Sequence, residues 1–241
     1  WRYKMNSCVI DIGGHDGSDT LFYLSQGYYV YTIEANPDLC KQIENSIPKG
    51  YRDMCEVHNL GINEPGIPSL DFYVSNISQF SSFKKDYASK LPHWREDYTK
   101  DNIIKEVLKI KTTSLDEFID DYVTKEIEYI KIDVDGSNLS AGRRLKKNIH
   151  AVKYLSIEVG DWDSHEFLYS DYGFKKFYVS DQEKVKGIKN ATNACGKVFE
   201  YEFSHGSSGL WGVDIDNWLP PGPELISSFS ISPWKDLHCS R

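Results

Sequence analysis

Short apolar segments alternate with amphipathic segments along the chain. Residues 8–13 (CVIDIG) and 29–35 (YVYTIEA) are largely apolar runs, which are typical of strands buried on both faces. Residues 18–27 and 37–47 have the spacing of helices, and the second begins with Pro37. The pattern predicts strands over residues 8–13, 29–35, 56–62, 69–75, 109–113, 128–136, 153–163, 174–181, 198–204 and 209–215, and helices over residues 18–27, 37–47 and 114–122.

This order of elements is typical of an α/β protein. It predicts a doubly wound, mostly parallel sheet with helices on both faces, and some antiparallel pairing near the end of the chain. We find no internal repeat and no low-complexity linker, so we expect a single domain over residues 1–241.

Two local features add detail to this prediction. Ser114 and Glu117 have the spacing of a capping box at the start of the helix over 114–122. Residues 76–102 are polar and aromatic, which is typical of a flap over an active site.

Composition and charge narrow the class of protein. A net charge of -8 and a pI near 5.4 argue against a nucleic-acid partner, because phosphate binding needs a basic surface. No segment reaches the roughly 18 apolar residues of a membrane-spanning helix. The five cysteines form no C-x-x-C pair, which favours a reducing, cytoplasmic compartment. The chain begins with Trp1 rather than Met, so we expect a domain of a longer protein.

A glycine turn follows the first strand. Asp11, Gly13 and Gly17 form D-x-G-x-x-x-G, which differs from the G-x-G-x-x-G of dinucleotide-binding folds. The glycines let a ligand approach the backbone, and a carboxylate at Asp11 suits a ligand that carries an ammonium group. Glu34 ends the second strand, where an acid can accept hydrogen bonds from both ribose hydroxyls. Together these acids indicate adenosine joined to an amino acid, which is S-adenosylmethionine.

Two further segments resemble a known family. Residues 111–119 (KTTSLDEFI) and 127–139 (IEYIKIDVDGSNL) are similar to the signature of the FkbM family of S-adenosylmethionine-dependent O-methyltransferases. Residues 154–159 and 207–219 resemble later stretches of that family, so the resemblance extends over most of the chain. It implies the class I methyltransferase fold, Rossmann-like with a seven-stranded sheet. It also implies methyl transfer to a hydroxyl of a sugar or glycan, and fusion to glycosyltransferase domains would agree with that role.

The sequence departs from the family pattern at three positions. Asp135 stands where the family has glutamate, and Asn138 stands where an acid often follows. The small residue that usually ends the third strand is Gly61 here. The two acid replacements bear on substrate contacts rather than on the fold.

The candidate site residues follow from strand ends, because ligands of doubly wound sheets bind beyond the carboxyl ends of the strands. Methyl transfer to a hydroxyl needs an aligned acceptor and a base. We expect Asp133 nearest the transferred methyl group, with Asp135, Glu158 and His165 as further catalytic candidates; a helix-capping role is the alternative for His165. The candidate cofactor-binding residues are Asp11, Gly13, Gly14, His15, Gly17, Glu34, Ala35, Asn59, Leu60, Ser81, Ser82 and Asp133.

Several alternatives are open at this point. The strand-end acids can be explained without a metal, because they would balance the positive charge of a sulfonium. Their oxygens would also suit Mg²⁺ or Mn²⁺. A divalent ion is therefore possible but not favoured. A metal-dependent small-molecule O-methyltransferase, a catalytically silent binding module and a nicotinamide-dependent oxidoreductase are the competing hypotheses. The absence of G-x-G-x-x-G after the first strand disfavours the nicotinamide-dependent oxidoreductase. The acids that could converge on a metal are Asp133, Asp135, Glu158, Asp161 and Asp163.

Overall fold

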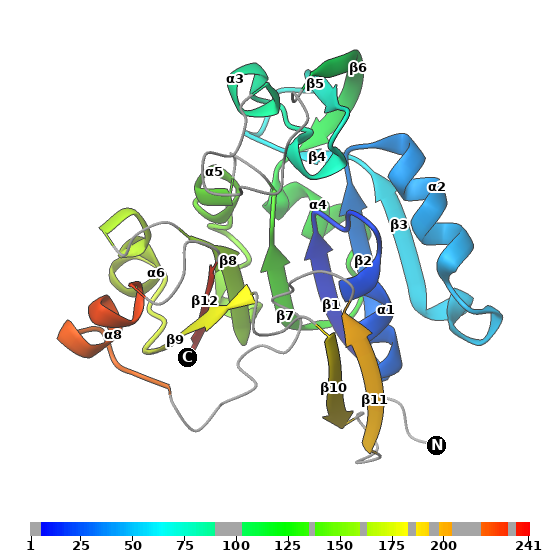
Figure 1. Ribbon diagram of the computed structural model, residues 1–241. Coiled ribbons are helices and arrows are strands. Elements are labelled where there is room, and N and C mark those ends of the chain that lie inside the picture. Colours follow the sequence, from blue (N-terminus) through cyan, green and yellow to red (C-terminus); the bar gives the residue numbers. More distant parts are fainter. Residues whose placement is uncertain are drawn as a thin grey trace.

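The computed structural model describes residues 6–89, 103–134, 138–159, 163–182, 187–192, 198–203, 218–230 and 235–241. A seven-stranded sheet in the order β3-β2-β1-β7-β8-β12-β9 forms its centre (Figure 1). The five strands from β3 to β8 are parallel, and β12 pairs antiparallel with both β8 and β9. The strands are β1 (Ser7–Ile12), β2 (Tyr29–Glu34), β3 (Cys55–Asn59), β7 (Glu126–Ile132), β8 (Tyr154–Glu158), β9 (Lys176–Asp181) and β12 (Lys235–Ser240).

Side chains of the central strands alternate between two apolar layers. In β1, Cys8, Ile10 and Ile12 join one core cluster, whereas Val9 joins the other. The first layer packs under α4 (Leu115–Tyr122), α5 (Asn138–Gly142), α6 (Phe167–Ser170) and α8 (Pro223–Ser228). The second packs under α1 (Ser18–Ser25), α2 (Pro37–Ser46) and the hairpin of β10 (Gly187–Thr192) and β11 (Val198–Phe203). The doubly wound, mostly parallel seven-stranded sheet with helices on both faces is therefore confirmed.

A smaller sheet lies beyond the carboxyl ends of the central strands (Figure 1). Its order is β4-β6-β5, with β4 (Gly61–Ile62), β5 (Ser69–Ser75) and β6 (Ile104–Thr113). The remaining short elements are α3 (Lys85–Ala88), η1 (Lys49–Met54), η2 (Ser78–Phe80), η3 (Ile149–Ala151) and η4 (Asp163–His165).

The predicted third strand, residues 56–62, divides at Leu60. Its first part is β3, which pairs with β2, and its last two residues are β4, which pairs with β6. The amide of Leu60 donates to the carbonyl of Glu34, so the chain leaves the central sheet beside the end of β2. This division brings the small sheet over the end of the large one.

Helix ends agree well with the sequence. Ser114 Oγ accepts from the amide of Glu117, and the Glu117 carboxylate accepts from the amide of Ser114, which confirms the capping box. Gly27 follows α1 with φ +87°, as expected for a glycine after a helix.

Other predictions differ from the structure or fall outside it. The strand predicted over 109–113 begins at Ile104, and β10 and β12 were not predicted. The strand predicted over 209–215 lies outside the described residues.

No helix in the described part of the chain is long and apolar enough to cross a membrane. Cys8, Cys40, Cys55 and Cys239 are free thiols, and Cys195 is not described.

Candidate active site

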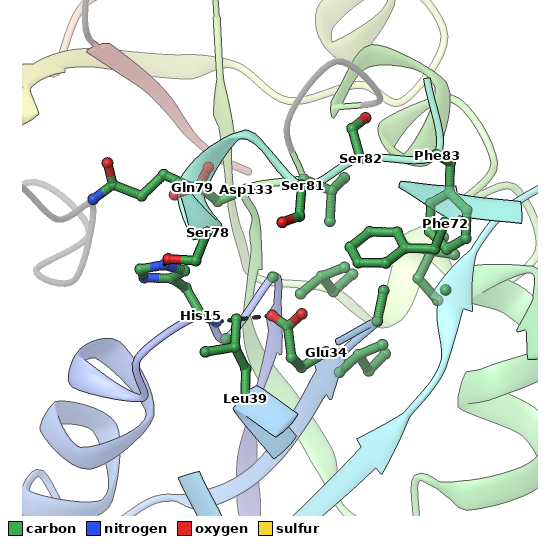
Figure 2. Close-up of a pocket in the computed structure, with 18 of the residues that line it drawn as sticks. His15, Glu34, Leu39, Phe72, Ser78, Gln79, Ser81, Ser82, Phe83 and Asp133 are labelled. Atoms are coloured by element: carbon green, nitrogen blue, oxygen red, sulfur yellow. Dashed lines mark hydrogen bonds between the residues drawn. The ribbon is translucent and has the colours of Figure 1, made fainter. Parts of the chain in front are cut away.

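A pocket opens at the carboxyl ends of β1, β2 and β7, where the strand order reverses direction along the sheet. The glycine turn after β1 forms one wall, and residues 78–83, between β5 and α3, form the opposite one (Figure 2). Part of the predicted flap over 76–102 thus lines the pocket; residues 90–102 lie outside the described chain.

The glycine turn packs tightly against the end of β7. Gly13 has φ +88°, and a Cβ atom there would lie 1.7 Å from the Asp133 carbonyl oxygen, so no side chain fits. Gly17 has φ +84° and immediately precedes α1. Of the predicted turn residues, Gly13, Gly14 and His15 line the pocket, whereas Gly17 shapes the turn without lining it.

Glu34 ends β2 and faces the middle of the pocket. One carboxylate oxygen accepts a hydrogen bond from the amide of His15 at 2.9 Å (Figure 2), and the other accepts from the amide of Asn36 at 2.8 Å. Burial raises the pKa of Glu34 to about 7, although these two amides act in the opposite direction. Near neutral pH this carboxyl group therefore exists in both protonation states and can meet donors from a ligand when ionised.

Ala35 and Asn59 support the same strand end. Ala35 lines the pocket. The Asn59 side chain is not part of the lining; its amide nitrogen donates to the carbonyls of Glu34 and Ala35, at 3.0 and 2.8 Å. The structure thus gives Asn59 a role in holding the end of β2.

One end of the pocket is apolar. Leu60, Ile62, Phe72 and Phe83 all line the pocket. The rings of Phe72 and Phe83 meet edge to face with centroids 5.0 Å apart (Figure 2). A Cβ atom at Gly61 would come within 2.3 Å of Phe83, so the missing side chain makes room for this ring. Neither phenylalanine was predicted, because Phe72 comes from the small sheet and Phe83 from the segment after it.

Ser81 and Ser82 line the pocket next to this apolar end. Ser81 Oγ accepts from the amide of Ser75 at 3.1 Å, and Ser82 Oγ accepts from the amide of Lys84 at 3.1 Å. The serine pair therefore stabilises the turn that carries the neighbouring rings.

The other end of the pocket holds a buried charge cluster around Lys131. Its Nζ lies 2.7 Å from Asp19 Oδ2, 3.3 Å from Asp133 Oδ2 and 3.7 Å from Asp11 Oδ1. Burial alone would lower the pKa of Lys131, but the three carboxylates raise it well above its ordinary value. Lys131 and Asp19 were not predicted. Asp11 lies directly opposite Lys131 in neighbouring strands, a pairing that depends on the register between β1 and β7.

Asp11 does not occupy the position that the sequence suggested. Its side chain is fully buried and accepts from Thr20 Oγ1 at 2.7 Å, and it is not among the residues that line the pocket. Of the three acids around Lys131, Asp19 and Asp133 line the pocket. In this structure Asp11 therefore faces Thr20 and Lys131 rather than the pocket.

Glu158 also lines the pocket, at the end of β8. Asn138 Nδ2 donates to Glu158 Oε2 at 2.7 Å, and Asn138 Oδ1 accepts from the amide of Val134. Asn138, at a position where the resembled family often has an acid, therefore links the ends of β7 and β8.

The remaining catalytic candidates are placed differently. His165 is buried beside Phe167 and does not line the pocket. Asp135 and Asp161 lie outside the described residues. Within the described ranges no group of three or more His, Cys, Asp or Glu side chains has the arrangement of a metal site.

Comparisons with known proteins bear on this site. A family model described as the methyltransferase FkbM domain matches residues 11–186. No curated protein matches the chain significantly. Similar solved structures include a human methyltransferase 10 domain containing protein (TM-score 0.43, 10% identity, covering 98% of this chain and 72% of that one). Another is the METTL16 MTase domain (TM-score 0.38, 12% identity, covering 74% of this chain and 56% of that one). A third is precorrin-6y C5,15-methyltransferase from Geobacter metallireducens (TM-score 0.36, 10% identity, covering 98% of this chain and 81% of that one).

Proposed function

Because the chain belongs to the FkbM methyltransferase family, we propose that it transfers a methyl group from S-adenosylmethionine to a hydroxyl of a sugar or glycan. The observation that carries this proposal is the position of Glu34 between the rings of Phe72 and Phe83 and the side chain of Asp133 in one pocket (Figure 2). A nucleoside linked to a cationic amino acid has the same order of chemical groups.

The pocket residues fit this cofactor group by group. The rings of Phe72 and Phe83, with Leu60, would hold adenine. The ionised carboxylate of Glu34 would accept the ribose hydroxyls, and Asp19 and Asp133 would face the cationic methionine part. When bound, S-adenosylmethionine supplies an electrophilic methyl group.

The acids near this end would act on the acceptor. A sugar hydroxyl is a weak nucleophile, so a carboxylate within hydrogen-bond reach that takes its proton favours attack. Besides Glu34, the described strand-end acids that line the pocket are Asp133 and Glu158, and Asn138 donates to one oxygen of Glu158. We assign proton acceptance to one of these two acids and orientation of the acceptor to the other.

The first experiment is isothermal titration calorimetry with S-adenosylmethionine, S-adenosylhomocysteine and NAD, each with and without Mg²⁺ or Mn²⁺. Micromolar binding of the two sulfur ligands without binding of NAD supports the proposal. Metal-dependent tightening would favour the metal-dependent O-methyltransferase instead. Failure of both sulfur ligands to bind would favour the silent binding module.

The acceptor class is tested next. Sugars and short glycans are screened for release of S-adenosylhomocysteine, with simple alcohols and polyketide alcohols as comparison. Turnover limited to sugars supports the glycan assignment.

A reducing, cytoplasmic compartment is a further proposal, supported by the four free cysteines in the described chain. Fusion to glycosyltransferase domains stays a prediction.

A further inference from the structure

Two side chains meet across the pocket, one from each of its opposite walls. His15 belongs to the glycine turn after β1, and Ser78 is the first residue of η2, in the segment between β5 and α3. His15 Nε2 lies 2.9 Å from Ser78 Oγ, and Figure 2 shows the hydroxyl next to the imidazole ring. Both residues line the pocket. We call this hydrogen bond the clasp.

The backbone of His15 is held firmly on its own wall. Its φ of +44° lies in the left-handed region, which few residues other than glycine adopt and which persists where surrounding contacts hold it. The His15 amide donates to Glu34 Oε2 at 2.9 Å, and the neighbouring Gly14 amide donates to the Ile33 carbonyl at 3.3 Å. The turn therefore presents the imidazole ring to the opposite wall from a fixed base.

The wall that carries Ser78 is anchored to the small sheet on either side of it. The amide of Asn76 donates to the carbonyl of Ile103 at 3.0 Å, and Ser82 exchanges two backbone hydrogen bonds with Tyr73, at 2.9 and 3.1 Å. Ser78 lies between these anchors and is exposed. The clasp therefore ties a stretch that belongs to the small sheet to a turn that belongs to the central sheet.

The clasp lies on the solvent side of the proposed ribose site. Glu34 is only 7% exposed, whereas Ser78 is exposed and His15 is half-buried. A ligand that reaches the Glu34 carboxylate therefore lies between the two walls that the clasp joins. The same wall as Ser78 carries Phe83, so separation of the walls would open the apolar end of the pocket as well.

We infer that the clasp gates the exchange of the cofactor: it opens for entry and exit and closes again over the bound molecule. This inference rests on the proposed function. Ser78 is then a positioning residue that acts through His15. A bond that is made both before and after binding slows association and dissociation by the same factor, and it therefore cancels from the dissociation constant.

The test measures rate constants and needs no acceptor. Association and dissociation of S-adenosylhomocysteine are followed by surface plasmon resonance for the wild type and for Ser78→Ala. We expect both rate constants to rise about threefold, near the lower end of what one hydrogen bond contributes, because Ser78 is exposed. The dissociation constant should stay within about twofold of the wild-type value. A direct contact between Ser78 and the ligand would instead raise the dissociation rate alone.

Two control variants accompany this measurement. Ser78→Thr keeps the hydroxyl and should retain the wild-type rates. Ser89→Ala removes a matched exposed serine after α3, whose Oγ donates to the Lys85 carbonyl at 3.1 Å and which does not line the pocket, and its rates should also stay unchanged.

A double-mutant cycle tests whether Ser78 acts through His15. Asparagine tolerates the left-handed backbone at position 15, but its shorter side chain does not reach Ser78. Because His15→Asn already lacks the clasp, adding Ser78→Ala to it should change neither rate constant. Acceleration by Ser78→Ala in the wild-type protein but not in His15→Asn supports the inference.

The outcomes separate this inference from the proposed function. Unchanged rates in Ser78→Ala, a rise of only one of the two rate constants, or the same acceleration in the His15→Asn background overturns the gate while leaving the methyltransferase proposal intact. If the wild-type protein does not bind S-adenosylhomocysteine, the proposed function itself fails, and the inference fails with it.

Discussion

We expect Glu34 to make the binding of the proposed cofactor depend on pH. Burial raises its pKa to about 7 in the ligand-free protein. Ribose hydroxyls donate hydrogen bonds, so they bind the ionised form and oppose the protonated one. Such a group is about 90% ionised at pH 8 and about 10% ionised at pH 6, so the affinity should fall about tenfold between these values.

The assay is calorimetry of S-adenosylhomocysteine binding at pH 6, 7 and 8. Titrations at pH 7 in buffers of different ionisation enthalpy should show release of about half a proton from Glu34 on binding. The ligand's own amino group also titrates near this range, so a matched protein is needed. Glu34→Gln resembles the protonated carboxyl group in shape, and it should bind weakly at all three pH values.

The comparison of the wild type with Glu34→Gln shows whether Glu34 causes the pH dependence. The wild type should lose about tenfold in affinity from pH 8 to pH 6, and Glu34→Gln should lose less than about threefold. The reasoning is refuted if the wild-type affinity is unchanged over this range, or if Glu34→Gln shows the same dependence as the wild type.

Three further predictions concern the turn, the charge cluster and the proposed base. Gly13→Ala should cost at least about 3 kcal/mol of unfolding free energy, because its Cβ meets a carbonyl oxygen at 1.7 Å. Gly66→Ala, at φ +81° with open space around it, should cost only about 1 kcal/mol in the same denaturant series. Lys131→Met should cost about 3–5 kcal/mol at pH 8 and less at pH 5, where protonation relieves the unpaired acids, as urea midpoints at the two pH values would reveal. Asp133→Ala should keep its thermal unfolding temperature within a few degrees and lower kcat at least about 100-fold with the acceptor found by the screen; unchanged turnover would remove this residue from the mechanism.

Local sequence patterns were enough to predict much of the central sheet. Strands such as 8–13 and 29–35 are mostly apolar because both of their faces are buried, and that composition is visible without a structure. The positive φ of Gly13 and Gly17 and the caps of the helices also have local signatures. These features depend on residues a few positions apart.

The missed features depend on distant residues. β12 (Lys235–Ser240) contains Asp236 and His238, which are buried side chains of types normally found at the surface, so its composition concealed a central strand. The apolar end of the pocket needs Phe72 and Phe83 to meet Leu60 across the break between two sheets. The pairing of Asp11 with Lys131 needs the register between β1 and β7, which no local pattern contains.

The place of β12 has a consequence for how the protein is made. β12 lies between β8 and β9, yet it begins at Lys235, far along the chain from Asp181, where β9 ends. During synthesis the ribosome releases both neighbours long before the strand that joins them, and each neighbour has an open edge in the interval. Closure of the sheet is therefore a late, long-range step, and a nascent chain that stalls before Lys235 presents the unpaired strand edges that molecular chaperones must shield from aggregation.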